Sequence, residues 1–168
     1  MSILKRFSLL LLCLIFCFLF ASCKTEILKQ NKFKTIDFSE VQKVQLVTSE
    51  EIYNILLSKS ENGCVTINYV DEAPEILLEM YIEISDGVCL IQSEEIEFST
   101  SINNFNNSFS PVVIYKFLME TDFENEPFTF ESEENAYSFE KNVLGKTVLF
   151  TVYLSLDENS QSYMIEVK

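Results

Sequence analysis

The sequence contains no histidine and no tryptophan, and only three glycines and three prolines among its 168 residues. Without histidine, the chain lacks the commonest metal ligand and the usual general base near neutral pH. Zinc sites, haem sites and Ser–His–Asp or Cys–His catalysis are therefore disfavoured. The scarcity of Gly and Pro, together with abundant Phe, Tyr, Ile, Val and Leu, argues against a low-complexity chain and favours β-strands.

The longest apolar run, residues 7–20, follows Lys5 and Arg6 and has 14 residues. A membrane-spanning helix needs about 20 apolar residues, so the run suits a cleaved export signal better than a permanent span. It ends in Phe20-Ala21-Ser22-Cys23. This segment resembles a bacterial lipoprotein signal peptide, with residues 20–23 as its lipobox, although Phe20 stands where the family prefers Leu. An ordinary cleaved signal and a short uncleaved anchor are the alternatives.

The resemblance implies that Cys23 receives a diacylglyceryl thioether, becomes the new N-terminus and is then N-acylated. Two or more acyl chains anchor a protein stably, whereas one does not. In some bacteria Asp after this cysteine retains lipoproteins at the inner membrane, and here Lys24 follows. The expected location is thus the bacterial cell envelope, lipid-anchored, with the outer membrane or cell surface favoured over the inner membrane.

The expected organisation is a signal peptide at 1–22, an anchor cysteine with its tether at 23–34, and a single β-rich domain at 35–168. From residue 35 onward six Lys stand against 25 Asp and Glu, a formal charge of −19. Such a domain repels nucleic acid, so we expect no nucleic-acid partner. The tether contains four lysines, Lys24, Lys29, Lys32 and Lys34. We expect them to be solvated rather than to bind anionic lipid headgroups.

Alternating apolar and polar residues predict eight to ten short strands at spacings typical of a sandwich or barrel. Thr48 to Glu51 matches a capping box and predicts a short helix over residues 48–58. Asp86-Gly87 predicts a type I′ hairpin turn, and residues 112–119 predict an apolar strand. The hairpin at 148–167 resembles the last two strands of immunoglobulin-like modules. The predicted fold is therefore mainly β, an antiparallel β-sandwich with one short helix near the N-terminus.

Cys64 and Cys89 are the two cysteines beyond the anchor. Outside the cytoplasm a cysteine pair suggests a disulfide. The hairpin at 86–87, however, places Cys89 opposite Ile84 on the inward face. A tight turn at 71–74 would place Cys64 opposite Tyr81 on the outward face, too far away to bridge. The disulfide remains a less favoured alternative.

Two further patterns bear on function. Ser138 and Lys141 match S-x-x-K, but no S-D-N element accompanies them and the context is β. Phe105 and Phe109 lie in the Ser/Asn-rich stretch 99–111, where aromatic side chains either anchor a partner or fold back onto the core. No D-x-D-x-D-G loop for calcium occurs among the acidic clusters.

We therefore expect no metal, no cofactor, no catalytic residues and no enzymatic activity. The predicted function is that of a membrane-anchored lipoprotein whose β-sandwich domain binds a protein or glycan. The alternative is a periplasmic carrier or assembly factor that holds an apolar ligand inside a β-barrel. A hydrolase using Ser138 and Lys141, or a carboxylate pair, is a third hypothesis and requires those side chains to converge in one cleft.

Overall fold

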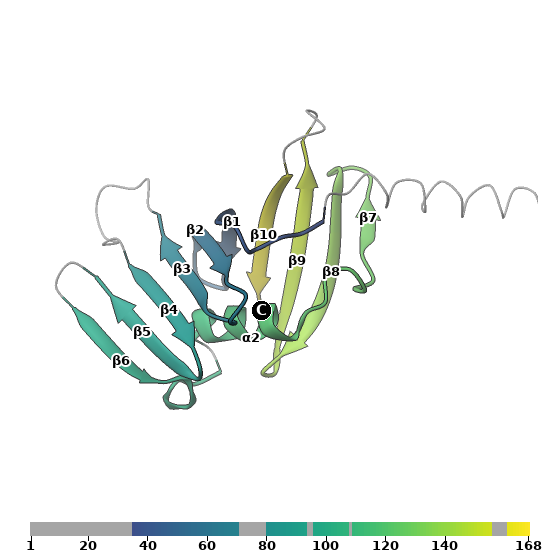
Figure 1. The fold of residues 1–168 in the computed structure, drawn as a ribbon. Helices are drawn as coiled ribbons and strands as arrows, with labels where there is room; N and C mark the ends of the chain where they lie inside the picture. Colours follow the sequence, from purple (N-terminus) through teal and green to yellow (C-terminus); the bar gives the residue numbers. More distant parts are fainter. Residues whose placement is uncertain (1–34, 71–79, 94–95, 108, 156–160) are drawn as a thin grey trace, which may run out of the picture. The chain divides into compact units, whose positions relative to one another are not determined.

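A computed structural model describes residues 35–70, 80–93, 96–107, 109–155 and 161–168, and Thr35–Lys168 form one compact unit. The predicted signal peptide, Cys23 and the tether lie outside the described residues, as does the predicted turn at 71–74. The unit is mainly β (Figure 1), with these elements in order: β1 Gln42–Val47, β2 Ile52–Lys59, β3 Val65–Tyr69, β4 Tyr81–Ser85, β5 Val88–Gln92, β6 Glu97–Ser101, the 3₁₀-helix η1 Ile102–Asn104, α2 Ser110–Glu120, β7 Thr129–Glu131, β8 Ala136–Val143, β9 Lys146–Leu154 and β10 Gln161–Val167.

The ten described strands form one mixed sheet in the order β6-β5-β4-β3-β2-β1-β10-β9-β8-β7. Two antiparallel meanders, β1 to β6 and β7 to β10, are joined by the parallel pair β1–β10, in which Leu46 lies opposite Ile165. The predicted antiparallel sandwich is therefore not what is observed, since the strands share a single sheet. Alternation marks a buried face on each strand, but it does not say how many sheets the strands form.

The sheet curves around α2. Strands β4 and β8 are six places apart in the sheet, which would separate them by about 29 Å if it were flat. An 11-residue helix is only about 16 Å long, yet α2 contacts both strands. We call the sheet face against α2 the inner face and the opposite one the outer face.

The single α-helix of the described residues is not where the sequence placed it. The apolar stretch predicted as a strand forms α2, which has Pro111 in its first turn. Its residues 111–115, 117 and 118 are buried, and a helix that is apolar on nearly all sides gives no helical period in the sequence. No helix among these residues is both long and apolar enough to cross a bilayer.

The predicted helix over residues 48–58 is wrong, because these residues form the β1–β2 hairpin. Thr48 Oγ1 accepts a hydrogen bond from the Glu51 N–H at 3.1 Å, as in a capping box. The Thr48 N–H, however, donates to the Glu51 carbonyl at 2.9 Å. The same side-chain contact therefore closes a turn between Val47 and Ile52, which are paired across the two strands.

The two hairpins predicted from the sequence are confirmed. Asp86 and Gly87 have φ angles of 49° and 77°, as a type I′ turn requires, and Ile84 pairs with Cys89. In the β9–β10 hairpin Phe150 pairs with Ile165, and both side chains are fully buried on the inner face.

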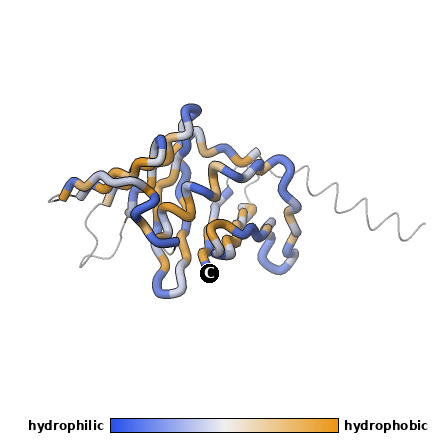
Figure 2. Tube along the Cα trace, turned by 90° about the horizontal axis from the view of Figure 1, so that it is seen from below, coloured by the Kyte–Doolittle hydropathy of each residue, from blue (hydrophilic) through white to orange (hydrophobic). Residues whose placement is uncertain are grey.

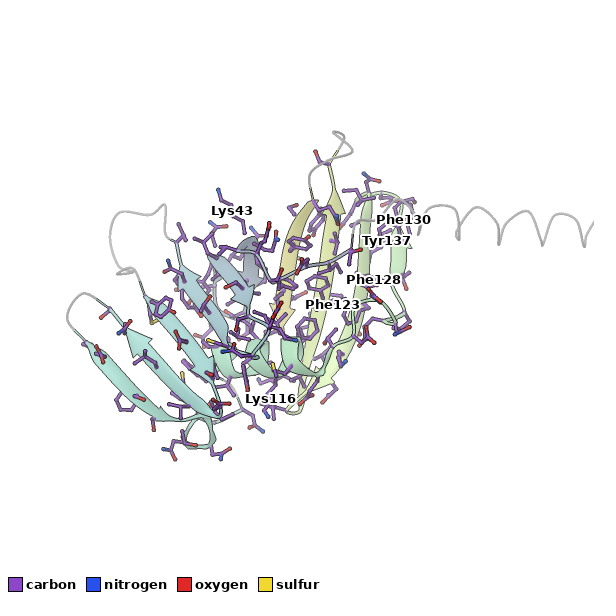
Figure 3. The ribbon with its side chains drawn as sticks, in the orientation of Figure 1. Lys43, Lys116, Phe123, Phe128, Phe130 and Tyr137 are labelled. Atoms are coloured by element: carbon purple, nitrogen blue, oxygen red, sulfur yellow. The ribbon has the colours of Figure 1, made fainter. Side chains whose placement is uncertain are left out.

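Aromatic rings fill the inner face beside α2. The centroid of the Phe150 ring lies 5.2 Å from that of Phe123, 5.7 Å from that of Phe139 and 5.8 Å from that of Phe117. Figure 3 labels Phe123 and, nearby, Phe128, whose ring lies 4.7 Å from that of Phe139. Hydrophobic and hydrophilic residues alternate along the strands (Figure 2), so polar side chains are left for the outer face.

Candidate functional site

A groove of about 440 Å³ opens on the outer face, over the four strands at the middle of the sheet. We call it the outer groove. The register brings its walls together: Gln45 lies between Asn54 of β2 and Met164 of β10, and Ser162 lies opposite Tyr153 of β9. Its lining consists of Lys43, Val44, Gln45, Asn54, Ile55, Leu56, Val70, Tyr153, Ser162, Tyr163 and Met164.

Among the residues that the structure describes, no carboxylate lines the outer groove, although the chain has 26 Asp and Glu. Lys43, labelled in Figure 3, is the one charged residue in the described part of its lining. The carboxamides of Gln45 and Asn54 supply both donors and acceptors of hydrogen bonds. The groove is therefore suited to a neutral polar ligand, or to one that carries a single negative charge.

Tyr153 and Met164 form an apolar wall of the outer groove. The Tyr153 hydroxyl donates to Met164 Sδ at 3.7 Å. Burial, together with the nearby carboxylates of Glu134 and Glu131, raises the pKa of Tyr153 above its ordinary value. The ring thus remains neutral across the physiological range and offers a flat surface for contact.

A second hollow, of about 300 Å³, lies at the N-terminal end of α2. Its lining includes Phe109, Ser110 and Lys146, with the rings of Tyr53 and Tyr69 edge to face at 5.5 Å. Burial raises the pKa of Tyr69 to about 12. This hollow has Glu50 in its wall, whereas the described lining residues of the outer groove include no carboxylate.

Phe105 and Phe109, predicted as a binding loop, stack on each other with centroids 4.4 Å apart. Both residues are half-buried, and Phe109 also lines the hollow beside α2. The pair is therefore packed against itself rather than projecting from the surface. A role for it in binding stays a prediction.

Cys64 and Cys89 are both free thiols. Cys89 is fully buried on the inner face, whereas Cys64 is half-exposed beside Glu83. The predicted pairing of Cys64 with Tyr81 is wrong, because Tyr81 pairs with Asn68. The cause is that β3 and β4 are connected by residues 70–80, not by a four-residue turn.

Ser138 and Lys141 lie on β8 but do not converge. They are three residues apart on a strand, so their side chains point to opposite faces. Ser138 Oγ donates to Glu131 Oε1 at 2.6 Å, whereas Lys141 Nζ donates to the Glu120 carbonyl at 2.7 Å. The geometry that the S-x-x-K hypothesis requires is therefore not found here.

Sequence reasoning did not identify the outer groove. A polar residue between buried neighbours, such as Gln45 between Val44 and Leu46, marks an outward position on a strand. What brings Gln45 beside Met164 is the parallel β1–β10 pair, which joins the two ends of the domain and leaves no local signal in the sequence. Among the described residues, no cluster of three or more Cys, Asp or Glu could hold a metal ion.

No protein-family model matches the chain, and no curated protein or solved structure shows significant similarity to it.

Proposed function

We propose that the protein is a lipid-anchored binding module of the bacterial cell envelope, attached through Cys23, and that its outer groove binds a glycan. The observation that supports glycan binding is the chemistry of the groove. Carboxamide, hydroxyl and ammonium groups stand beside a tyrosine ring, and none of the described lining residues carries a carboxylate. A sugar has hydroxyl groups and an apolar ring face. The polar side chains can hydrogen-bond to the hydroxyl groups, and the tyrosine ring can contact the apolar face.

Charge sets the limits of the ligand class. With 25 carboxylates in residues 35–168, a polyanionic ligand would be repelled over roughly 8–10 Å at physiological ionic strength. Within the groove Lys43 compensates for one negative charge. The expected ligand is a neutral sugar, or one with a single carboxylate.

The packing of the core argues against carriage of an apolar ligand inside the sheet. The fully buried side chains of Phe117, Phe150 and Leu46 occupy the space between the sheet and α2. The outer groove is open to solvent, and its polar lining residues Lys43, Gln45, Asn54 and Ser162 are all exposed, which favours a polar ligand over a stored lipid.

The binding proposal is tested by screening the protein against a glycan array and titrating the best ligand by calorimetry. Replacing both Gln45 and Asn54 by Ala is expected to weaken binding about 5- to 150-fold, since each lost hydrogen bond costs about 0.5–1.5 kcal/mol. Asn142→Ala is the matched control, because Asn142 is an exposed carboxamide on β8 outside the groove. Equal effects of the two replacements would reject the groove as the site.

The anchor is tested separately. Cells expressing the full chain are labelled with an alkyne fatty acid, and the protein is examined for incorporated label. Label is expected on the natural chain and not on Cys23→Ser, whereas Cys64→Ser keeps it. Lipidation at Cys23 would be rejected if the natural chain stayed unlabelled, or if Cys23→Ser were labelled as strongly as Cys64→Ser. Either result would leave the proposal of glycan binding unaffected.

A further inference from the structure

The hollow at the N-terminal end of α2 is separate from the outer groove, and we call it the α2 hollow. It lies on the inner face, where β10 ends beside α2 (Figure 1), and none of its described lining residues belongs to the outer groove. Its volume of about 300 Å³ is at the lower end of the range for small-molecule pockets, about 300–1,000 Å³. The α2 hollow therefore has room for one small molecule.

The first turn of α2 leaves hydrogen-bond donors at this hollow. Its N-cap residue, Phe109, provides no side-chain cap. The N–H groups of Val112 and Val113 donate to the Phe109 carbonyl at 3.0 and 3.3 Å, and Pro111 has no N–H. Ser110 lines the hollow, and neither its N–H nor its hydroxyl bonds to any residue that the structure describes. The positive end of the helix dipole also favours a negative charge here.

Tyr69 of β3 supplies a donor that is independent of the helix. The residue is only 8% exposed and lines the hollow, so the accessible part of its side chain faces the hollow. A buried tyrosine hydroxyl usually has a hydrogen-bond partner, but within the described part of the chain this one has none. Because burial raises the pKa of Tyr69 to about 12, the hydroxyl keeps its proton at neutral pH. It can therefore donate a hydrogen bond to an anion in the hollow.

The charges in the wall of the hollow indicate a ligand with a single negative charge. Lys146, the first residue of β9, is half-buried and lines the hollow. Neither of the ion pairs between described residues includes it, so its charge is available to a ligand. Glu50, which is exposed, is the one carboxylate in the described lining. Lys146 compensates for one negative charge, whereas Glu50 would repel the second charge of a dianion such as phosphate.

The rest of the described lining includes apolar side chains. They come from the sheet and from the start of α2, and they are Leu46, Met80, Phe109, Pro111 and Val167. The Tyr69 N–H donates to the Met80 carbonyl at 3.0 Å, which places Met80 beside the tyrosine. A ligand that fills the hollow therefore needs an apolar body as well as its charge, since a fully polar anion would leave these side chains without contacts.

We propose that the α2 hollow binds a small monocarboxylic acid with an apolar body. The carboxylate accepts hydrogen bonds from the Tyr69 hydroxyl and the Ser110 N–H, and Lys146 compensates for its charge. The apolar body contacts Phe109 and Pro111. This binding does not depend on the glycan proposal, because the two sites share no described lining residue.

The test is a titration of the isotope-labelled full chain, purified in detergent, with benzoate, followed by nuclear magnetic resonance. Benzoate, which carries one carboxylate on an apolar ring, is expected to shift the amide signals of Ser110 and Val112 until the site is saturated. Benzamide has the same shape without the charge and should bind at least about tenfold more weakly, since hydrogen bonds to charged groups are the stronger ones. The proposal is overturned if benzoate shifts only Gln45 and Asn54 of the outer groove, or if benzamide binds as tightly.

Two variants each remove one group that the carboxylate contacts. Tyr69→Phe removes only the hydroxyl and Lys146→Met only the ammonium group, and each is expected to weaken benzoate binding about tenfold. Tyr81→Phe and Lys116→Met are the matched controls, because both residues lie outside the described lining of the hollow and of the groove. They are expected to leave the affinity for benzoate unchanged. Circular dichroism checks that all four variants keep the fold.

Glu50→Gln tests the proposal in the opposite direction. It removes the one carboxylate of the described lining, so it is expected to strengthen benzoate binding by up to about fivefold, a gain that damage to the fold would not produce. Glu40→Gln makes the same change of charge at an exposed position outside the hollow and should have no such effect. The proposal fails if Tyr69→Phe and Lys146→Met both bind benzoate as the natural chain does, or if Glu50→Gln binds it more weakly.

Discussion

Two lysines hold the C-terminal end of α2 from opposite sides. Lys59 Nζ of β2 donates to the Leu118 carbonyl at 2.8 Å, and Lys141 Nζ of β8 donates to the Glu120 carbonyl at 2.7 Å. The last four carbonyls of a helix have no partner within it, and cations are favoured there by the helix dipole. Lys141 also pairs with Glu126 at 2.6 Å. These lysines therefore fix the helix to both meanders of the sheet.

We predict that Lys141→Met lowers the free energy of unfolding by about 1.5–3 kcal/mol, the range for hydrogen bonds to charged groups. Methionine keeps the apolar stem and removes the ammonium donor. Lys168→Met is the control, because the Lys168–Glu166 pair is more exposed and such pairs contribute at most about 1 kcal/mol. Urea denaturation measures both. Equal losses in the two variants would contradict a capping role for Lys141.

The Cys64 thiol provides a prediction on pH. Its pKa is raised first by burial and second by the Glu83 carboxylate beside it. The thiolate is the reactive form, so alkylation of native Cys64 at neutral pH is expected to be slower than that of an exposed thiol. Its rate should keep rising above pH 9, where the thiolate forms. Burial raises the pKa of Cys89 as well, and Cys89 should react only after unfolding.

Glu83→Gln removes the negative charge and keeps the shape, so the pKa of Cys64 should fall part of the way. Because burial, the first cause, still raises this pKa in the variant, we predict that the alkylation rate at pH 8 rises but stays below that of an exposed thiol. Peptide mass mapping follows each cysteine separately, and the rate at Cys89 after unfolding is the control. An unchanged rate at Cys64 would show that Glu83 does not act on this thiol.

Among the elements, the β8–β9 hairpin contains a turn whose first residue, Leu144, is not a typical turn residue. Leu144 and Gly145 have φ angles of 54° and 80°, the same pattern as Asp86-Gly87. Leucine is costly in this region, by about 1–2 kcal/mol, whereas asparagine adopts it readily. Leu144 is 37% exposed, so the apolar burial lost on its replacement offsets only part of this cost.

We predict that Leu144→Asn stabilises the protein by about 0.5–1 kcal/mol, by relieving the strain at positive φ. Leu144→Val is the comparison and should destabilise it, because a β-branched side chain fits this conformation worst. Thermal unfolding of the two variants ranks them. If the valine variant were as stable as the asparagine variant, the turn would not have this conformation.

The elements that could be predicted from the sequence carry local signals. Asp86-Gly87 is such a signal, as is the alternation of Val148, Phe150 and Val152. The helix α2 could not be predicted, because its burial on almost all sides removes the helical period. The helix predicted from Thr48 was wrong because the hydrogen bond to its side chain is compatible with both a helix start and a tight turn. The outer groove depends on the parallel β1–β10 pair, which no local pattern indicates.

For the whole molecule, α2 is the element that both meanders share. It contacts β4 in one and β8 in the other, and its Phe117 is fully buried. The Phe117 ring lies 5.8 Å from Phe150 and 5.9 Å from Phe139. Because each meander buries its inner face against the same helix, we expect neither to be stable without the other. The domain should therefore unfold in one cooperative transition.

We predict that Phe117→Ala lowers the free energy of unfolding by about 3–5 kcal/mol, the cost of a large cavity in a core. Met119→Ala is the control on the same helix, since Met119 is 42% exposed and should cost less than about 1 kcal/mol. Far-ultraviolet circular dichroism reports the strands, and fluorescence of the seven tyrosines reports tertiary packing in both meanders. The two probes should give one midpoint, shifted together in Phe117→Ala. Two separate midpoints would mean that the meanders fold independently and that α2 does not unite them.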